Sequence, residues 1–554
     1  MELRKNQEIT LKIDDLGNNG EGIGHVDGYA LFVKDALPGE TIRARIMKCK
    51  KKYGFARMME VLECSASGRV EPRCSVARQC GGCTLQHLSY EKQLAYKEKK
   101  VRDCLVRIGG VDAEKVEWLP VLGMEMPWQY RNKAQFPVRM QEDDSGVLRP
   151  AAGFYAGRTH SIIPVTDCAI QHPCMKEILD TILSWMQEQH VPAYDEVSHR
   201  GLVRHIYIRR AYHTSQITVC LVVNSRQLSE NLKRTLIEKL TGIPGVTGIL
   251  LNINTDQTNV ILGKDMILLW GQEYIEDRIG EICYHISPQS FYQVNPVQTE
   301  KLYQTALEFA DLSGEETVWD LYCGIGTISL FLAKNAKKVY GVEIVPAAIQ
   351  NARENARLNG IQNAEFFCGA AEEVVPRLAE EMAALADVVV VDPPRKGCDG
   401  VLLDTIVKMA PARIVYVSCD PGTLARDVKL LGEKGYEVKK VRACDMFGQG
   451  GHVETVCLLS KLHSDQHIEV ELQMDELDLT AAESKATYEE IKDYVLEHSG
   501  LKVSNLYIAQ IKQKCGIIER VNYNLPKSEN SRQPKCPPEK EVAIREALEY
   551  FRMI

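Results

Sequence analysis

The sequence predicts an α/β protein. The predicted order along the chain is a small β-barrel, a mixed α/β domain, an open α/β sheet in the second half and a short helical extension. Three observations lead to this fold class. The chain has 554 residues, which is too long for a single hydrophobic core. Residues 1–63 contain short strand-like runs separated by glycine turns. From about residue 281, strand, turn and helix patterns alternate as in an open α/β sheet.

Composition narrows the class of protein. Hydrophobic residues make up 45% of the chain and charged residues 26%, which is ordinary for a soluble protein. We find no run of about 18 apolar residues and no apolar signal core, and therefore expect a cytoplasmic protein without a membrane span. The 18 cysteines of such a chain are read as thiols, metal ligands or catalysts. The net charge of −8 argues against a generally basic nucleic-acid binder but allows a local basic face.

The barrel is predicted from turns at residues 17–24 and 38–39 around the apolar run 29–33. Lysines and arginines then interleave with Tyr53 and Phe55 between residues 43 and 57. Cations that neutralise phosphates and rings that stack bases are the combination used by oligonucleotide-binding barrels. A solvated basic strand is the alternative. The segment resembles the TRAM domain, which favours RNA binding.

A cysteine cluster follows the barrel, with Cys74, Cys80 and Cys83 in the spacing C-x5-C-x2-C. Three thiols this close converge readily on one centre. The candidates for a fourth ligand are Cys168, which we favour, Cys64 and Cys174. Four thiolates suit either zinc or an iron–sulfur cluster, and the spacing favours iron only weakly.

The middle of the chain is less regular and fits a mixed α/β domain, with a strand-like run at 216–223. Two stretches, 130–133 and 204–210, are both basic and aromatic. Each could contact RNA, or could be a strand with one solvated face.

A cofactor turn is predicted where the strand 317–322 meets the turn 323–327 and a helix begins at 328. Glycines in such a turn let the backbone approach a ligand closely. Glu343 ends the next strand, where an acid hydrogen-bonds ribose hydroxyls. A dinucleotide site is the rival, but Ser329 stands where its third glycine would be. The acidic Asp320 before the turn favours S-adenosylmethionine.

Two further strands deliver reactive groups. The strand 388–391 leads into Asp392, and the strand 414–417 leads to Cys419. Carboxyl ends of such strands face the ligand crevice, so both side chains should lie beside the cofactor and the target. Amino-group methyltransferases usually carry an aromatic residue where Arg395 follows the paired prolines, so carbon methylation is favoured.

Cys419 and the downstream Glu454 fit methylation of a pyrimidine at carbon 5. A thiolate that adds to carbon 6 of uracil makes carbon 5 nucleophilic, and a base must later remove the carbon-5 proton. A lone cysteine is more often a small buried hydrophobe, so the surrounding motifs carry the interpretation.

Over roughly residues 1–480 the sequence resembles the RNA uracil-5-methyltransferase family. The matching pieces are the TRAM-like start, the cysteines, and the segments 290–296, 320–327, 392–397, 418–421 and 452–454. One departure is the glycine-rich run 447–452, where family members often carry Pro and Thr; we expect a looser loop before Glu454.

The resemblance implies a role for each motif. It implies a [4Fe-4S] cluster on the set Cys74, Cys80, Cys83 and Cys168. It implies S-adenosylmethionine contacts at Gln293, Tyr322, Glu343 and Asp392. It implies that Cys419 is the nucleophile and that Glu454 is the base. The barrel and cluster resemble the branch that acts on 23S ribosomal RNA, and we expect a monomer. The alternatives are a transfer-RNA uracil-5-methyltransferase and a non-catalytic RNA-binding iron–sulfur protein.

The predicted domains are the barrel at 1–63, an RNA-binding domain with the iron–sulfur site at 64–280, the catalytic domain at 281–470 and a helical extension at 485–554. In the extension a capping box at 487–490 and the apolar spacing after Ser504 predict two helices. A plain helical appendage is favoured over a helix-turn-helix unit.

Overall fold

The computed structural model describes residues 3–64, 68–143, 145–157, 159–382, 386–462, 488–515 and 536–551. The chain forms two compact units, Met1–His463 and Ser464–Ile554. None of the helices in the described ranges combines the length and the apolar character that a membrane crossing requires.

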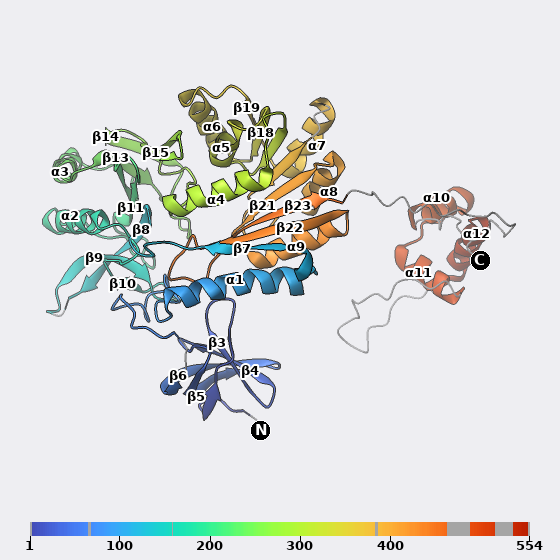
Figure 1. Cartoon of the computed structure of the whole chain (residues 1–554), viewed down its shortest axis with the longest axis horizontal. Helices are drawn as coiled ribbons and strands as arrows, with labels where there is room; N and C mark the ends of the chain where they lie inside the picture. The colour runs from blue at the N-terminus through green and yellow to red at the C-terminus, as the bar shows by residue number, and fades with distance from the viewer. Residues whose placement is uncertain are drawn as a thin grey trace. The chain divides into compact units, whose positions relative to one another are not determined.

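The N-terminal part of the first unit is a curved six-stranded sheet, which is antiparallel except for one parallel pair, β4 with β6; it corresponds to the predicted barrel, and we keep that name (Figure 1). Its strands are β1 (Glu8–Lys12), β2 (Asp15–Leu16), β3 (Gly22–Val26), β4 (Tyr29–Lys34), β5 (Glu40–Cys49) and β6 (Tyr53–Cys64). They pair in the order β1-β5-β6-β4-β3-β2. Just after β1, the N–H of Asp14 donates to the carbonyl of Ile23 in β3 at 2.8 Å, which draws the two sides of the sheet together.

Alternating apolar residues of these strands, such as Leu31 and Val33, form the core of the barrel. On its surface the basic stretch is partly neutralised across the strands. Arg43 pairs with Glu60 at 2.8 Å, and Arg45 pairs with Glu8 at 2.6 Å. The sequence shows no acid within the stretch, but antiparallel pairing supplies acids from its neighbours.

The middle of the chain is a mixed sheet with the order β10-β9-β8-β11-β12-β13-β14. Helices α2 and α3 pack on one face around Ile178, Trp185 and Leu236. The elements are β8 (Lys133–Glu142), β9 (Leu148–Tyr155), β10 (Ile162–Pro164), α2 (Cys174–Glu188), β11 (Val203–Arg210), β12 (Ile217–Val223), α3 (Glu230–Thr241), β13 (Val246–Ile253) and β14 (Asp265–Gly271).

A doubly wound sheet forms the second half of the first unit, with the order β19-β18-β17-β20-β21-β23-β22-β7. Its elements are α4 (Pro296–Ala310), β17 (Thr317–Leu321), α5 (Thr327–Ala333), β18 (Lys338–Glu343), α6 (Pro346–Leu358), β19 (Ala364–Cys368), α7 (Ala371–Met382), β20 (Val388–Val391), α8 (Gly400–Met409), β21 (Arg413–Ser418), α9 (Pro421–Gly432), β22 (Tyr436–Cys444) and β23 (Glu454–Lys461). A ribbon of β15 (Ile275–Ile279) and β16 (Ile282–Ile286) precedes it.

Helices cover both faces of this sheet (Figure 1). Successive residues of β17 point to opposite sides, so that Val318 packs with α4, α5 and α6, and Trp319 packs with α7, α8 and α9. One helix and one strand from the earlier chain join this layer: α1 (Tyr90–Arg107) packs beside α9, and β7 (Glu117–Leu122) pairs in parallel with β22. The short helix η1 (Ala113–Lys115) connects them.

The second unit contains α10 (Tyr488–Ser499), α11 (Asn505–Lys514) and α12 (Pro538–Tyr550) among its described residues. Their core includes Ile491, Ile508, Ile511 and Ile544. The predicted capping box begins at Thr487, which lies outside the described residues, as does the acidic segment before it. The sequence did not indicate α12.

The predicted fold class is confirmed: a Rossmann-like catalytic domain, a TRAM-type β-domain, a mixed α/β region and a helical extension. The strand, turn and helix pattern after residue 281 follows the prediction closely, for instance in β17, α5 and β18. The finer division at residues 63, 280 and 470 stays a prediction. α1 and β7 lie before residue 280 in sequence, yet they pack with the large sheet of the second half.

Candidate active site

A cavity of about 640 Å³ opens where the parallel strands of the large sheet end. Tyr322 follows β17, Glu343 ends β18, Asp392 follows β20 and Cys419 follows β21. Glu454 begins β23, which is antiparallel to β21, so it lies at the same edge. Gln293 joins them from the segment before α4, and the cavity is thus lined by all six residues that the sequence proposed for catalysis and for cofactor contacts.

The glycine turn shapes one end of this cavity. Tyr322, Gly324 and Gly326 have φ values of 70°, 57° and 81°, in the left-handed region that glycine adopts without strain. No atom lies within 4 Å of the position that a Cβ on Gly324 would take, so the space beside the turn is open. The Gly324 N–H donates to Oε2 of Glu343 at 3.2 Å. This acid is therefore held beside the turn, as a ribose-binding carboxylate would be.

Ser329 has a structural reason to replace the third glycine of a dinucleotide turn. Its hydroxyl is buried and donates to Oδ2 of Asp320. Burial raises the pKa of Asp320 to about 7, and the Ser329 hydrogen bond opposes that rise. Asp320 does not line the cavity but supports the turn from within the sheet.

Burial sets the electrostatics of the reactive groups. It raises the pKa of Asp392 to about 7. Burial and the charge of Asp392 raise the pKa of Glu454 to about 8. Burial, followed by the charges of Glu454 and Asp392, raises the pKa of the Cys419 thiol to about 11. Two acids and a thiol that influence one another in one pocket are typical of an active site.

Arg395 is the cation that opposes these shifts, because its charge lowers the pKa of both Cys419 and Glu454. Phe447 and His452 also line the cavity. All three residues lie inside sequence motifs, and Arg395 already favoured carbon methylation, but their residue types alone indicate no role in the site. Their position after strand ends or in the loop before Glu454 is the only signal that could have assigned one.

The glycine-rich loop before Glu454 is firmly anchored, contrary to the expectation that it would be loose. Gln449 in this loop is only 2% exposed, and its carbonyl accepts the N–H groups of Thr84 and Leu85, each at 3.0 Å. The Gln449 N–H donates to Oε1 of Gln93 in α1, and Nε2 of Gln93 donates back to the Gln449 side chain, both at 3.1 Å. Thr84 directly follows Cys83, so the cysteine loop contacts the loop that leads to Glu454.

Lysines of α1 complete the anchor. Lys97 is fully buried, pairs with the equally buried Asp445 and donates to the carbonyl of Phe447 at 2.9 Å. Lys100 donates to the carbonyl of Gly451 at 2.9 Å and to that of Asn18 in the barrel at 2.8 Å. One helix thus connects the barrel to the loop before Glu454. Nothing in the sequence marks these lysines, because their partners lie about 350 residues away along the chain.

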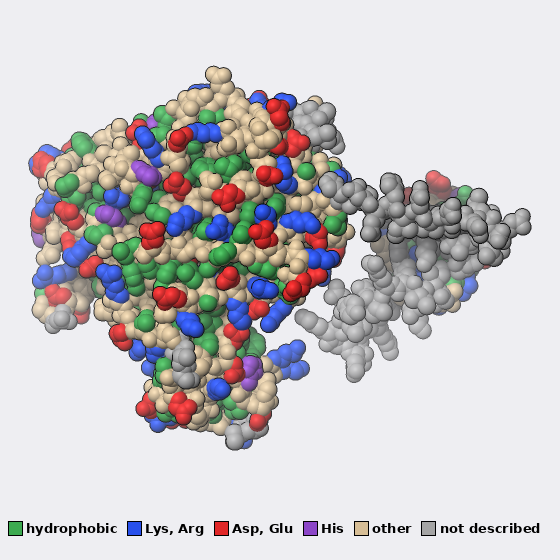
Figure 2. Space-filling view, in the orientation of Figure 1, with side chains coloured by type: hydrophobic (Ala, Val, Ile, Leu, Met, Phe, Trp, Pro, Cys, Tyr) green, Lys and Arg blue, Asp and Glu red, His purple; other side chains and the backbone are tan. Residues whose placement is uncertain are grey.

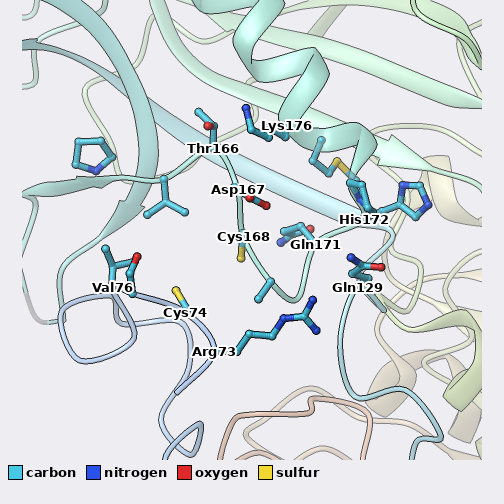
Figure 3. A pocket seen from close by; sticks show the side chains of 16 residues that line it. Arg73, Cys74, Val76, Gln129, Thr166, Asp167, Cys168, Gln171, His172 and Lys176 are labelled. Atoms are coloured by element: carbon cyan, nitrogen blue, oxygen red, sulfur yellow. The ribbon is translucent and has the colours of Figure 1, made fainter. Parts of the chain in front are cut away.

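The four cysteines predicted as metal ligands share one neighbourhood. In Figure 3 the Cys74 and Cys168 side chains lie at the same pocket, which Arg73 and Lys176 also line. Burial raises the pKa of Cys83 to about 12, and negative charge on Cys168, Cys80 or Cys74 raises it further. Within the described residues, however, no three His, Cys, Asp or Glu side chains are grouped to hold one metal ion. The rivals Cys64 and Cys174 do not line this pocket.

Comparisons with known proteins agree with this geometry. A family model described as tRNA (Uracil-5-)-methyltransferase matches residues 202–462, and the TRAM domain model matches residues 2–59. An uncharacterized RNA methyltransferase of Clostridium acetobutylicum is 50% identical over 461 residues, which cover 83% of this chain and 98% of the relative. One from Halalkalibacterium halodurans is 50% identical over 82% of this chain and 98% of its own length.

The chain belongs to the RNA uracil-5-methyltransferase family. A solved relative is the tRNA (uracil-54, C5)-methyltransferase of Pyrococcus abyssi, determined in complex with S-adenosyl-L-homocysteine. It is 27% identical, with a TM-score of 0.65, and the match covers 81% of this chain and 99% of that one. The family models end at residue 462, so the second unit lies beyond the part of the methyltransferase that they match.

The buried Lys97–Asp445 pair makes a stability prediction. Lys97→Ala leaves the Asp445 carboxylate buried without its partner and should lower the free energy of unfolding by about 3–5 kcal/mol. Lys99→Ala is the matched control: Lys99 is in the same helix and pairs with Asp15 and Asp103, but it is 52% exposed. It should cost less than about 1 kcal/mol. Urea denaturation measures both changes, and equal losses would contradict the anchoring role.

Proposed function

We propose that this chain transfers a methyl group from S-adenosylmethionine to carbon 5 of a uridine in 23S ribosomal RNA. The observation that carries the chemistry is the arrangement of Cys419, Glu454 and Asp392 around one cavity at the strand ends. A thiol nucleophile and a buried carboxylate are the two groups that substitution at this unreactive carbon needs.

The cofactor end of the cavity fits S-adenosylmethionine, which supplies the methyl group when bound. The open space at Gly324 and the carboxylate of Glu343 suit a ribose beside the turn. Gln293, Tyr322 and Asp392 line the same cavity and are proposed to hold the rest of the cofactor next to the target base. The target must leave its stack to reach this depth, as in other enzymes that modify bases.

The protein residues then act in sequence. Cys419 loses its proton to solvent, and its Sγ forms a bond to carbon 6 of the uracil while the electrons of the C5–C6 double bond move onto carbon 5 and the O4 enolate. After carbon 5 has gained the methyl group, the Glu454 carboxylate removes the carbon-5 proton. The Sγ–C6 bond breaks and returns its electrons to the thiolate, so the ring recovers its double bond. Arg395 keeps both groups in their reactive protonation states, since its positive charge stabilises the Cys419 thiolate and the ionised Glu454 carboxylate before they react.

Two features support ribosomal RNA as the substrate: the TRAM domain and the neighbouring four cysteines, for which we propose a [4Fe-4S] cluster. The cluster is proposed from the family resemblance and from the shared neighbourhood of the four thiols, since thiolates are the ligands that iron–sulfur clusters use. Transfer RNA is the second candidate. It is favoured by the solved relative, which is named as a tRNA methyltransferase and whose match covers 81% of this chain.

Two substitutions test the covalent mechanism. Cys419→Ala should abolish methylation, because no bond to carbon 6 can form. Glu454→Gln should lower turnover by about 10²- to 10⁴-fold and leave RNA attached to the protein, because carbon 5 keeps its proton. Denaturing gels with labelled RNA detect the adduct. Cys368→Ala, an exposed cysteine outside the cavity, is the control and should behave as wild type. Full turnover by Cys419→Ala would refute the mechanism.

The raised pKa values predict the pH dependence. Glu454, with a pKa of about 8, acts as a base only when deprotonated, and Cys419, with a pKa of about 11, attacks only as thiolate. Both active forms become more abundant as pH rises. The single-turnover methylation rate should therefore increase from pH 6.5 to 9, with cofactor binding measured at each pH as the control. A rate that falls over this interval would contradict the assigned protonation states.

The substrate is identified with protein purified without oxygen, labelled S-adenosylmethionine, and separate pools of unmodified ribosomal and transfer RNA. We expect label in the large ribosomal RNA and, by iron and sulfide analysis, about four of each per chain. Label confined to transfer RNA would contradict the ribosomal assignment and leave the chemistry intact. Protein active on RNA but without iron would contradict the cluster.

A further inference from the structure

A second cavity, of about 420 Å³, lies beside the catalytic one; we call it the flanking groove. Residues that line it include Trp128, Tyr130, Arg131, Arg210, Tyr212 and Lys301. A short segment separates the two cavities: residues 291–294 line the catalytic cavity, and residues 295–298 line the groove. Asn132 at the base of the groove fixes this segment, because its N–H donates to the Val294 carbonyl at 2.9 Å and its Nδ2 to the Gln293 carbonyl at 3.0 Å.

The groove unites the two basic and aromatic stretches of the sequence. β8 and β11 are antiparallel neighbours with Lys133 opposite Arg209, and the Arg210 N–H donates to the carbonyl of Asn132 at 2.8 Å. The start of β8 and the end of β11 therefore lie side by side, which brings the stretches 130–133 and 204–210 together although they are far apart in sequence. Arg209 itself is buried there and donates to the carbonyls of Ser287 and Ser290, so it supports the segment between the cavities.

Among the described residues that line the groove, cations outnumber acids. Among the described residues that line it, Arg131, Arg210 and Lys301 are cationic, and Glu125 is the one carboxylate. Arg210 and Lys301 donate to neutral partners, the Ser215 hydroxyl and the Gly123 carbonyl. Burial, then the charges of Arg209 and Arg131, lowers the pKa of the adjacent Lys133 to about 8. On the face drawn in Figure 2, cations and acids are intermixed.

Aromatic surface accompanies this charge. Tyr212 is 48% exposed at the rim, and Trp128 is half-buried on the opposite stretch. The guanidinium of Arg73 lies 5.4 Å from the centre of the Trp128 ring. Arg73 lines the cysteine pocket, which shares Gln129 and His172 with the groove, so the two hollows adjoin. Accessible rings beside cations are the means by which proteins hold single-stranded nucleic acid.

We propose that the flanking groove binds the nucleotide next to the target uridine in a single-stranded segment of the RNA. Arg131, Arg210 and Lys301 contact its phosphate, and Trp128 or Tyr212 stacks on its base. This inference rests on the proposed function, since it concerns the same RNA. It has a physical reason: a base that is flipped into the catalytic cavity stays there only if the backbone beside it is held.

The test measures binding and does not depend on methylation. The probe is a fluorescein-labelled single-stranded oligouridylate of about 12 nucleotides, and anisotropy gives its dissociation constant over a range of KCl concentrations. The double variant Arg131→Ala/Arg210→Ala should bind about 10- to 100-fold more weakly. Its log–log salt slope should fall in magnitude by about 0.7, which corresponds to one phosphate contact on a single strand. Arg234→Ala, an exposed arginine of α3 paired with Glu238, is the matched control and should change neither quantity.

Stacking is tested separately. Trp128→Ala should weaken binding by about 5- to 100-fold, and Trp128→Phe should restore most of it, because a phenyl ring still offers a face to the base. An unchanged dissociation constant for S-adenosylmethionine shows that each variant is folded. The proposal is overturned if the double variant binds the oligonucleotide like wild type. If that variant also fails to bind inorganic pyrophosphate, the groove is a site for small anions instead. Failure of the wild type to methylate any RNA would instead count against the proposed function.

Discussion

The burial of Asp392, Glu454 and Cys419 at one sheet edge is the constraint on which the rest of the site depends. In water, each acid would be ionised and the thiol would ionise near its ordinary pKa. In the pocket, burial raises all three pKa values, and Arg395 is the nearby charge that opposes this for Cys419 and Glu454. Charges interact more strongly in a partly buried pocket than in water, so the charge of Arg395 helps to decide which group holds a proton.

The loop that carries Glu454 into this pocket is held in place by segments from the N-terminal half of the chain. The loop before Glu454 contains three glycines and would be costly to order by itself. It is held instead by Gln93 and Lys97 of α1 and by the backbone that follows Cys83. Because Lys100 also reaches the barrel, one helix joins the TRAM domain, the cysteine loop and the loop that leads to Glu454. This arrangement gives the cysteine region a place in the active site without requiring it to take part in the reaction.

The local parts of this account could be predicted from the sequence. A buried run such as 388–391 that is followed by a polar residue predicts a strand that ends at a ligand crevice. The polar residues that follow two such strands, Asp392 and Cys419, do line one cavity. The connections between distant segments could not be predicted. β7 and α1 pack with the large sheet, and Lys97 pairs with Asp445. Both contacts join segments that are far apart in sequence, and the hydrophobic periodicity of a segment does not indicate its distant partners. Likewise, the acids that neutralise Arg43 and Arg45 come from other strands, and the two basic and aromatic stretches meet only through the register of β8 and β11.

The most direct test of the central claim uses RNA in which 5-fluorouridine replaces uridine. Fluorine at carbon 5 cannot be removed as a proton is, so an enzyme that adds a thiolate to carbon 6 should stop after methyl transfer with the RNA attached. Incubation of the wild-type protein with S-adenosylmethionine and this RNA, followed by digestion and mass spectrometry, locates the attachment. The account predicts a methylated fluorouridine linked to the peptide that carries Cys419. Linkage to a different cysteine, or no linkage by protein that methylates ordinary RNA, would contradict it.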